Sequence, residues 1–401
     1  MTGSKHAYVN DEYRRWKQTL VTVAGRSLAL ASKPGVFAHG GVDPSSLLLA
    51  RYVRAASGAV VVHMNCHNGL LGAAIALSGN AARVVLTDRN VLAIEAASRT
   101  LRANGVASAE LYVGHGAAAL PDLTADVVAI RMPREKLALL QLLHDAFATL
   151  KLGGHCYLAG ATNDGAKTAA RTLSQIFGNS ATLAIESGHR IAHAVKRADT
   201  IAHDAPTSRF LDSDAFNEQT HELRGNAYTF SSRPGVFSWD HLDEATAILA
   251  EHMDVQPNDR VLDLGCGYGV LGVVAGRIAN AHPVTMVDVD SEAVRSAARS
   301  ASAAGLGIAR AMGSDAASAV LEERFDLVVT NPPFHVGKAT DLSVPIQFIA
   351  DAFAVLAPGG RLNLVANRTL PYEGAIKHLF KNITTVSDGR RYKVLSAMKN
   401  R

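Results

Sequence analysis

The residues best suited to chemistry are Asn331-Pro332-Pro333-Phe334, which follow an apolar stretch at 325–330. The Asn331 side-chain oxygen and the Pro332 carbonyl can each accept one N–H from the exocyclic amine of a nucleobase. Such bonds orient the lone pair of this poor nucleophile and stabilise the positive charge that develops as a methyl group arrives. The prolines stiffen the turn, and Phe334 offers a face on which a flipped-out base can stack. We therefore predict a catalytic site for methyl transfer at Asn331, Pro332 and Phe334.

A glycine-rich loop, Asp263-Leu264-Gly265-Cys266-Gly267-Tyr268-Gly269, stands where an expected strand passes into an expected helix. Glycines there allow close approach to a ligand, and the helix N-terminus supplies N–H groups. The spacing Gly267-x-Gly269-x-x-Gly272 also fits the dinucleotide fingerprint, so the loop alone leaves open a nicotinamide or flavin cofactor and an oxidoreductase. An acid at the strand end, Asp263, favours S-adenosylmethionine instead because it suits the methionyl end of that cofactor.

Two further acids complete the expected cofactor site. Asp288 ends the next strand and can accept hydrogen bonds from ribose hydroxyls. Asp315 can accept one from an adenine amino group, although the N-cap of a helix explains an aspartate there equally well. The predicted contacts with S-adenosylmethionine are Asp263, Gly265, Gly267, Gly269, Asp288, Asp315 and Asn331.

Alternating strands and helices must position these residues. In the second half we expect strands at 260–264, 284–288, 325–330 and 361–366, helices at 271–278, 292–304 and 346–356, and a final strand pair at 383–386 and 393–398. This alternation is typical of a mainly parallel sheet covered by helices. The sequence therefore predicts the α/β class, with two tandem Rossmann-like domains that each hold a mainly parallel seven-stranded sheet with helices on both faces.

The chain contains an internal duplication. Ser32-Lys33-Pro34-Gly35-Val36-Phe37 recurs as Ser232-Arg233-Pro234-Gly235-Val236-Phe237, an offset of 200 residues. The same offset aligns further pairs, among them Asp43 with Asp243, Cys66 with Cys266, Asp88 with Asp288 and Pro133 with Pro333. A register held over this length indicates two copies of one domain. We expect a degenerate first domain at 1–198, a linker at 199–216 and a catalytic domain at 217–401.

The first copy lacks the residues that the chemistry needs. His63 replaces the strand-end acid, and Asn65 and His67 replace the first two loop glycines. A histidine side chain there would fill space that the cofactor needs. Arg131 replaces the catalytic asparagine, and a guanidinium has donors but no acceptor. The spacing of the two histidines suits a metal site on a helix, whereas they lie on a strand and a loop, so we expect no metal.

The charge of the chain is uneven. Residues 1–200 hold 21 lysines and arginines against 13 acids, a net charge of +8, whereas residues 201–401 hold 19 against 23, a net charge of −4. A basic half is attracted to phosphates, although scattered solvated charges explain the same count, because no dense basic run occurs. We hypothesise that the first domain binds RNA. The candidate RNA contacts are Arg51, Arg54, Arg83, Arg89, Arg134, His335 and Lys338.

The composition fits a soluble globular protein, with 48% hydrophobic and 19% charged residues among 401. No apolar run approaches the roughly 18–20 residues of a membrane helix, and residues 1–17 hold no apolar signal segment. Cys66, Cys156 and Cys266 form no C-x-x-C pair, which fits a reducing compartment. We expect a cytoplasmic monomer with no membrane association.

Several stretches resemble the bacterial ribosomal RNA guanine-N2 methyltransferases. They are Asn331-Pro332-Pro333-Phe334-His335-x-Gly337, Val365-Ala366-Asn367-Arg368-x-Leu370-Pro371-Tyr372 and Gly389-Arg390-Arg391-Tyr392-Lys393-Val394. The Arg-Pro-Gly-Val-Phe run at 233–237 and the tandem plan also match, so the resemblance spans nearly the whole chain. The most similar family is ribosomal RNA small subunit methyltransferase C, and the large-subunit methyltransferase G family is a close relative.

This resemblance implies two class I methyltransferase domains, S-adenosylmethionine as cofactor, and a guanine amine of 16S rRNA in the small ribosomal subunit as substrate. By the same resemblance Gly265, Gly267, Asp288 and Asp315 contact the cofactor, and Asn331, Pro332 and Phe334 hold the base. Other substrates stay open at this point, namely a large-subunit rRNA guanine, adenine N6 in nucleic acid, or a glutamine side chain of a protein. A non-catalytic RNA-binding assembly factor with two relic domains is the alternative of another class.

Overall fold

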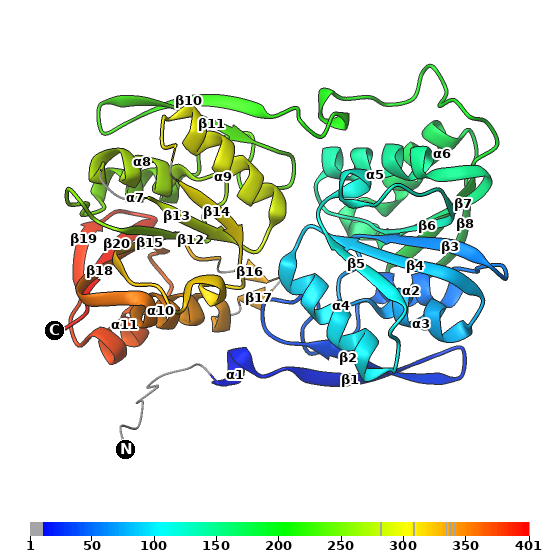
Figure 1. Ribbon diagram of the computed structural model, residues 1–401, viewed down its shortest axis with the longest axis horizontal. Helices are drawn as coiled ribbons and strands as arrows, with labels where there is room; N and C mark the ends of the chain where they lie inside the picture. The colour runs from blue at the N-terminus through cyan, green and yellow to red at the C-terminus, as the bar shows by residue number, and fades with distance from the viewer. Residues whose placement is uncertain are drawn as a thin grey trace. The chain divides into compact units, whose positions relative to one another are not determined.

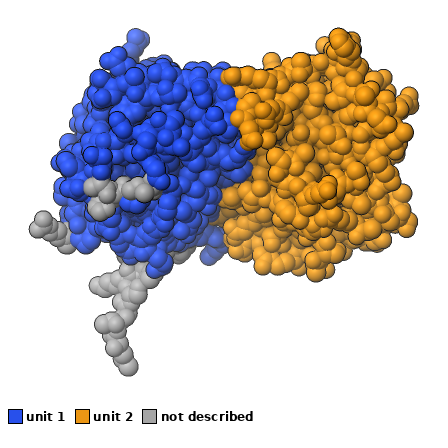
Figure 2. Space-filling model, turned by 45° about the horizontal axis from the view of Figure 1, so that its top comes forward, with its two compact units in different colours: residues 1–15, 216–401 blue, residues 16–215 orange. Residues whose placement is uncertain are grey.

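The computed structural model describes residues 11–280, 283–307, 309–333, 335–336, 339–340 and 342–400. The chain forms two compact units, shown in different colours in Figure 2. The first-copy unit comprises Trp16–Ala215, and the second-copy unit comprises Phe216–Arg401 together with the N-terminal residues up to Arg15. Each unit carries one copy of the duplicated sequence.

The sheet of the second-copy unit has the strand order β14-β13-β12-β15-β18-β20-β19 (Figure 1). Its strands are β12 (Val261–Leu264), β13 (Thr285–Asp288), β14 (Arg310–Gly313), β15 (Phe325–Thr330), β18 (Leu356–Asn367), β19 (Thr384–Asp388) and β20 (Tyr392–Met398). The first five are parallel, and β20 is antiparallel to both of its neighbours. The strand order reverses between β12 and β15, and ligands of such sheets bind beyond the carboxyl ends of the strands at that reversal.

Helices cover both faces of this sheet. They are α7 (Glu244–His252), α8 (Val270–Ala279) and α9 (Ser291–Ala303) on one face, and α10 (Ser343–Val355) and α11 (Tyr372–Phe380) on the other. Val261 packs in the buried cluster of the first face, while Leu262 and Leu264 pack in that of the second. This alternation follows the two-residue period of a strand. Every residue of β12 is buried, as expected for a strand covered on both sides.

The first-copy unit repeats this architecture with the strand order β5-β4-β3-β6-β7-β9-β8. Its strands are β3 (Ala59–Met64), β4 (Ala81–Asp88), β5 (Ala109–Val113), β6 (Ala125–Arg131), β7 (Leu150–Ala161), β8 (Ala181–Glu186) and β9 (His189–Val195). Its helices are α2 (Pro44–Tyr52), α3 (Leu70–Ser78), α4 (Val91–Ala103), α5 (Lys136–Thr149) and α6 (Ala166–Phe177). Each copy therefore contains a mainly parallel seven-stranded sheet with covering helices, and the predicted fold class is confirmed.

A two-stranded hairpin precedes each sheet, and the sequence reasoning did not predict it. The hairpins are β1 (Lys17–Val23) with β2 (Arg26–Ser32), and β10 (Asn217–Leu223) with β11 (Asn226–Ser232). Both central residues of the second turn, Arg224 and Gly225, have positive φ of 51° and 70°. Positive φ at both positions is typical of the tight hairpin turn whose twist matches the strands. A short pair of strands, β16 (His335–Val336) and β17 (Ala339–Thr340), follows β15.

The two ends of the first domain differ from the predicted boundaries. The short helix α1 (Asp11–Arg14) belongs to the second-copy unit, where Tyr13 is 3% exposed within the cluster that contains Phe348. The predicted linker at 199–216 packs instead on the first-copy unit, since Ile201, Ala205 and Leu211 contact its core. Divided by compact unit, residues 16–215 hold 19 basic and 14 acidic side chains, and the remainder holds 21 and 22. The charge difference between the units is therefore +5 against −1, smaller than the halves of the sequence indicated.

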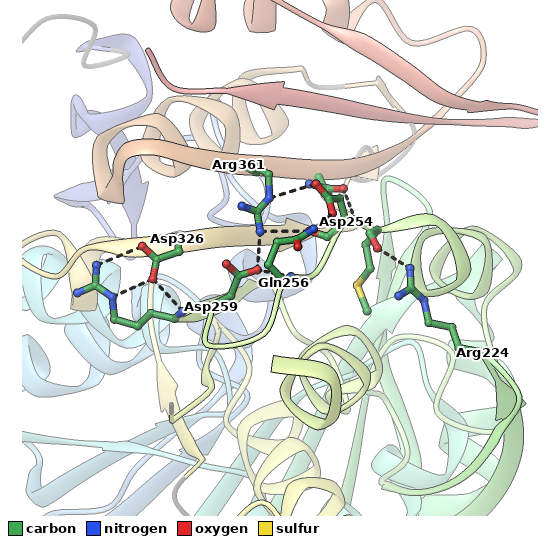
Figure 3. Close-up of polar contacts among 9 residues, drawn as sticks. Arg224, Asp254, Gln256, Asp259, Asp326 and Arg361 are labelled. Carbon is green, nitrogen blue, oxygen red and sulfur yellow. Dashed lines mark hydrogen bonds and ion pairs between the residues drawn. The ribbon is translucent and has the colours of Figure 1, made fainter. Parts of the chain in front are cut away.

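Polar contacts join the amino ends of the central strands in the second-copy unit (Figure 3). Arg361 on β18 pairs with Asp259 and with Asp254, the latter at 3.4 Å. Arg260 donates to Asp326, the second residue of β15, at 3.0 Å. These ion pairs lie at the edge of the sheet opposite to the carboxyl ends of the strands. No helix among the residues that the structure describes is long and apolar enough to cross a membrane.

Candidate active site of the second copy

The glycine-rich loop lies between β12 and α8, at the carboxyl edge of the sheet. Gly265, Gly267 and Gly269 have φ of 75°, 53° and 92°, in the left-handed region that favours glycine. A Cβ at Gly265 would lie 2.8 Å from the Phe348 ring, and one at Gly269 would lie 3.1 Å from Ala297. A Cβ at Gly267 would meet no described atom within 4 Å. The loop is therefore packed from beneath at two glycines and borders open space at Gly267.

Asp263 lies under this loop and is fully buried. Its Oδ2 accepts a hydrogen bond from the Gly272 N–H at 2.7 Å, whereas Oδ1 has no hydrogen-bond partner among the described residues. The pKa of this carboxyl is raised to about 7, chiefly by burial; the Gly272 bond opposes this shift, and the charge of Asp288 adds to it. A buried carboxylate oxygen of this kind is suited to a cationic ligand. The residue fits the ammonium group of S-adenosylmethionine.

Asp288 is the last residue of β13 and is held in a fixed orientation. Its two oxygens accept from the backbone N–H groups of Gly267 and Asp290, each at 2.9 Å. The acid that was predicted to bind the ribose therefore also fixes the loop that borders the open space. In the first copy Asp88 accepts from His67 and Asn90 at the same distances.

Asp315 follows β14 and accepts a hydrogen bond from the Tyr13 hydroxyl at 2.6 Å. The donor comes from α1, 302 residues earlier in the chain. The next residue, Arg14, pairs at 2.7 Å with Asp351, whose side chain is 4% exposed. Helix α1 thus anchors beside the acid that was predicted to bind adenine, and Asp315 retains acceptor capacity because a carboxylate has about four lone-pair sites.

Asn331 follows β15, across the strand reversal from the glycine loop. Its amide nitrogen donates to Asp243 Oδ2 at 3.0 Å and to the Thr246 hydroxyl at 2.9 Å. The same Asp243 oxygen caps α7 by accepting from the Thr246 N–H and hydroxyl at 2.9 and 3.0 Å. A carboxylate accepts and does not donate, so only the nitrogen of Asn331 can face Asp243. The amide oxygen is consequently directed away from α7.

The remaining residues of the catalytic turn are described in part. Pro332 is buried and Pro333 is exposed. Phe334 and Lys338, which were predicted to contact base and RNA, lie outside the described residues. His335 is described only through its backbone in β16.

The first copy has different contacts at the aligned positions. Arg131 pairs with Asp43, its Nε lying 3.3 Å from Oδ2, and both side chains are buried. The Asn65 amide donates to the Arg131 carbonyl at 2.8 Å. Burial lowers the pKa of His63 and of His67 to about 3, so both rings are neutral at pH 7. The His67 ring thus stands where the second copy has Gly267, and the Arg131 guanidinium stands where it has the Asn331 amide. Both differences support the interpretation that the first copy does not catalyse.

Four of the candidate RNA contacts make polar contacts within the first-copy unit. Arg51 pairs with Glu186 at 3.0 Å, and Arg54 donates to the Arg51 carbonyl at 2.6 Å, so these two lie together. Arg83 lies near the amino end of β4 and donates to Glu110 through two nitrogens, at 2.6 and 2.8 Å. Arg89 follows the carboxyl end of the same strand. Arg134 lies 3.8 Å from Asp164.

Sequence reasoning missed several residues that border the candidate site. Asp243 and Thr246 hold Asn331, and Tyr13 contacts Asp315. The duplication aligned Asp43 with Asp243, and the Asp-x-x-Thr spacing is an N-cap signal that could have identified the pair. No sequence signal indicates Tyr13, because it precedes the duplicated register. Among the described residues no group of three or more metal-binding side chains occurs.

Comparison with known proteins identifies the family. A family model described as the methyltransferase small domain matches twice, at residues 27–193 and 227–396. Ribosomal RNA small subunit methyltransferase C of Pseudomonas entomophila is 32% identical over 287 residues, which cover 71% of this chain and 82% of that protein. The protein of the same name from Hahella chejuensis is 32% identical over 282 residues, covering 70% and 80%.

A solved structure agrees with these relatives. The T. thermophilus 16S rRNA N2 G1207 methyltransferase, in complex with AdoMet and guanosine, has a TM-score of 0.80 and 30% identity. The match covers 97% of this chain and 99% of that one, so both domains are shared. The predicted resemblance is confirmed. The chain, which the methyltransferase small domain matches twice, belongs to the ribosomal RNA small subunit methyltransferase C family.

Proposed function

We propose that this enzyme transfers the methyl group of S-adenosylmethionine to the exocyclic N2 amine of a guanosine in 16S rRNA of the small ribosomal subunit. The observation that carries the proposal is the fixed orientation of Asn331, whose amide nitrogen is held by Asp243 and Thr246. This leaves the amide oxygen to accept an N–H of the substrate. The solved relative, whose title names a 16S rRNA N2 activity with AdoMet and guanosine, supports the same substrate class.

The residues of the glycine loop fit the cofactor. Asp263 offers a buried oxygen that has no partner among the described residues, and Gly267 borders space in which no described atom lies within 4 Å of an added Cβ. In our proposal Asp263 binds the ammonium group, and Gly265, Gly267 and Gly269 let the backbone approach the ligand. Asp288 binds the ribose, and Asp315 binds adenine beside the Tyr13 hydroxyl. When bound, S-adenosylmethionine supplies an electrophilic methyl group on a sulfonium.

The catalytic turn acts on the amine. The lone pair of a guanine amine is delocalised into the ring, so the nitrogen is a poor nucleophile. Asn331 Oδ1 and the Pro332 carbonyl each accept one of its N–H groups, which localises the lone pair and stabilises the positive charge on nitrogen. Phe334 stacks on the base. Direct transfer requires no covalent bond to the protein, and no nucleophilic Ser, Cys or His is assigned.

Asn331→Ala tests this role. We expect turnover to fall about a hundredfold, as for loss of one preformed polar contact to developing charge, with S-adenosylmethionine affinity changed less than about threefold. The assay is mass mapping of N2-methylguanosine in 16S rRNA after incubation with small subunits from cells that lack the enzyme. Equal losses in turnover and cofactor affinity would contradict the role of Asn331. A methylated adenine or glutamine as product would contradict the proposed substrate.

The first-copy unit is proposed to bind rRNA and to support the catalytic unit. Its net charge of +5 supports this role. Arg134 and Arg51 are more suitable phosphate contacts than Arg83, because the latter is neutralised by two short bonds to Glu110. Arg134→Ala should reduce the salt dependence of rRNA binding by about one counterion. An unchanged slope for both Arg134→Ala and Arg51→Ala would argue against these two arginines as phosphate contacts.

We also propose a cytoplasmic location and a monomeric state. Cys66, Cys156 and Cys266 are all buried as free thiols, which is typical of a reducing compartment. Sedimentation of the full chain at several concentrations measures the oligomeric state, and a mass above that of one chain would contradict the second part.

A further inference from the structure

Phe37 and Phe237 occupy equivalent positions in the two copies but have different surroundings. The Phe37 ring packs against His67, with ring centroids 4.8 Å apart, and against the Arg131 guanidinium, 4.3 Å from its centroid. The aligned positions in the second copy are Gly267 and Asn331, which present no ring and no cation. Phe237 is accordingly 62% exposed, compared with 37% for Phe37.

The backbone carries both phenylalanines in the same way. Gly35 and Gly235 have φ of 90° and 89°, and Ala38 and Ser238 have φ of 57° and 50°. The turn in each copy is closed by two equivalent backbone hydrogen bonds. In the first copy the Val36 N–H donates to the Lys33 carbonyl at 3.0 Å, and the His39 N–H donates to the Val36 carbonyl at 3.1 Å. In the second copy the Val236 N–H donates to the Arg233 carbonyl at 3.1 Å, and the Trp239 N–H donates to the Val236 carbonyl at 3.2 Å. The Phe237 side chain therefore starts from the position that puts Phe37 over residues 67 and 131.

The backbone around the two partner positions is also equivalent. His67 and Gly267 have φ of 51° and 53°. The N–H of His67 donates to Asp88 and that of Gly267 donates to Asp288, each at 2.9 Å. Arg131 and Asn331 each bind the aspartate that caps the first helix of their copy. From this equivalent backbone the Phe237 side chain can reach the space between the glycine loop and the turn at Asn331. This space borders Gly267, where no described atom lies within 4 Å of an added Cβ.

The charges of the second copy fit a cation at this place. Replacing Arg131 by the neutral Asn331 removes a positive charge, while the partner aspartate is kept as Asp243. Replacing neutral His63 by Asp263 adds an ionisable acid. S-adenosylmethionine carries a sulfonium and an ammonium cation against one carboxylate. A cation over an aromatic face is attracted by the negative face of the ring.

We propose that the Phe237 ring binds the sulfonium centre of the methyl donor, in the place that the Arg131 guanidinium takes over Phe37 in the first copy. This rests on the proposed function, because the donor must lie between Gly267 and Asn331. Once the methyl group has left, the product S-adenosylhomocysteine is a neutral thioether. The ring therefore favours donor over product, which promotes exchange after each turnover.

The test compares the binding of S-adenosylmethionine and S-adenosylhomocysteine to the full chain by calorimetry, without rRNA. Phe237→Leu keeps an apolar side chain and removes the aromatic face. We expect its affinity for S-adenosylmethionine to fall about fivefold more than its affinity for S-adenosylhomocysteine. Phe237→Trp should preserve the wild-type ratio, because tryptophan has the strongest cation-binding face. Phe37→Leu is the matched control in the first copy and should change neither affinity.

Other outcomes overturn the proposal in distinguishable ways. Equal losses for the two ligands in Phe237→Leu would show apolar packing without recognition of the cation. Unchanged affinities with a higher KM for small subunits would show that Phe237 contacts the rRNA base instead. Wild-type protein that binds neither ligand would overturn the proposed function itself. Because Phe237 is 62% exposed, its replacement should leave the melting temperature near that of wild type, which circular dichroism verifies.

Discussion

At the scale of single residues, the two copies differ by what faces a shared aspartate. Asp43 binds a buried guanidinium and Asp243 binds an amide nitrogen, although both cap a helix in the same manner. The cap is thus a structural feature of both copies. What differs is the group that binds the capping aspartate, which is the Arg131 guanidinium in the first copy and the Asn331 amide in the second. The acid that caps α7 also orients the Asn331 amide, which we propose as the catalytic group, so one carboxylate serves both roles in this proposal.

Thr246 offers the sharpest test of this orientation, because its hydroxyl accepts from Asn331 while its backbone N–H makes the cap. Thr246→Val keeps the shape and the backbone N–H of the cap. It removes one of two bonds to the amide, together with the hydroxyl bond to Asp243. Loss of one net hydrogen bond, about 1.4 kcal/mol, should lower kcat about tenfold. S-adenosylmethionine affinity and melting temperature should change little.

Thr246→Ser is the matched control, since the first copy has Ser46 in this role with its hydroxyl 2.8 Å from Asp43. The serine variant should keep at least half of the wild-type kcat. If the valine variant keeps wild-type activity while the serine variant loses it, the methyl group and not the hydroxyl matters, and the positioning role fails.

At the scale of elements, the two edges of the catalytic sheet have separate tasks. The carboxyl edge holds the glycine loop and Asn331, while the amino edge is joined by ion pairs (Figure 3). Arg361 and Asp259 have side chains only 15% and 7% exposed, whereas those of Arg260 and Asp326 are 47% and 36% exposed. Water therefore screens the Arg260–Asp326 ion pair more strongly than the Arg361–Asp259 ion pair.

Arg361→Ala should lower the free energy of unfolding by about 3 kcal/mol, because it leaves Asp259 buried without its partner. Arg260→Ala, at the same edge, should cost at most about 1 kcal/mol. Urea denaturation measures both, and cofactor affinity should be unchanged in each. Similar costs for the two variants would mean that burial does not distinguish these pairs.

The sequence predicted those elements whose pattern is local. The expected strand at 325–330 matches β15, and the expected helix at 292–304 is α9 within one residue at each end. Strand β18 begins at Leu356 and not at residue 361 as expected. A Pro-Gly-Gly run usually ends a strand, but here Gly359 adopts a φ of 82° and the strand continues through the run. Helix α1 was not predicted, since four residues give no period and its stability comes from Tyr13 in a distant core.

At the scale of the whole molecule, the second copy buries an acid where the first copy buries a histidine. Asp263 and His63 share one place at the end of the first strand, and both are fully buried. Burial disfavours the charged form of each, which raises the pKa of the aspartate and lowers that of the histidine. The two units should therefore respond to pH in opposite directions.

For Asp263 the folded pKa of about 7 exceeds the unfolded value of 3.8. Its contribution to stability is complete below pH 3.8 and is lost as pH rises toward 7, by up to about 4 kcal/mol. For His63 the folded pKa of about 3 lies below the unfolded 6.5. Its contribution is complete above pH 6.5 and is lost, by a similar amount, as pH falls toward 3.

Asp263→Asn and His63→Met should separate these effects in calorimetry of the cofactor-free full chain. Relative to wild type, Asp263→Asn should gain stability between pH 4 and 7 as pH rises, and His63→Met should gain it as pH falls from 6.5. Saturating S-adenosylmethionine should reduce the first difference, because its ammonium favours the ionised carboxylate, and should leave the second unchanged. A stability difference from wild type that stays constant at every pH would mean that neither group titrates as its burial requires. A stability difference for Asp263→Asn that is the same with and without ligand would mean that Asp263 does not bind the cofactor.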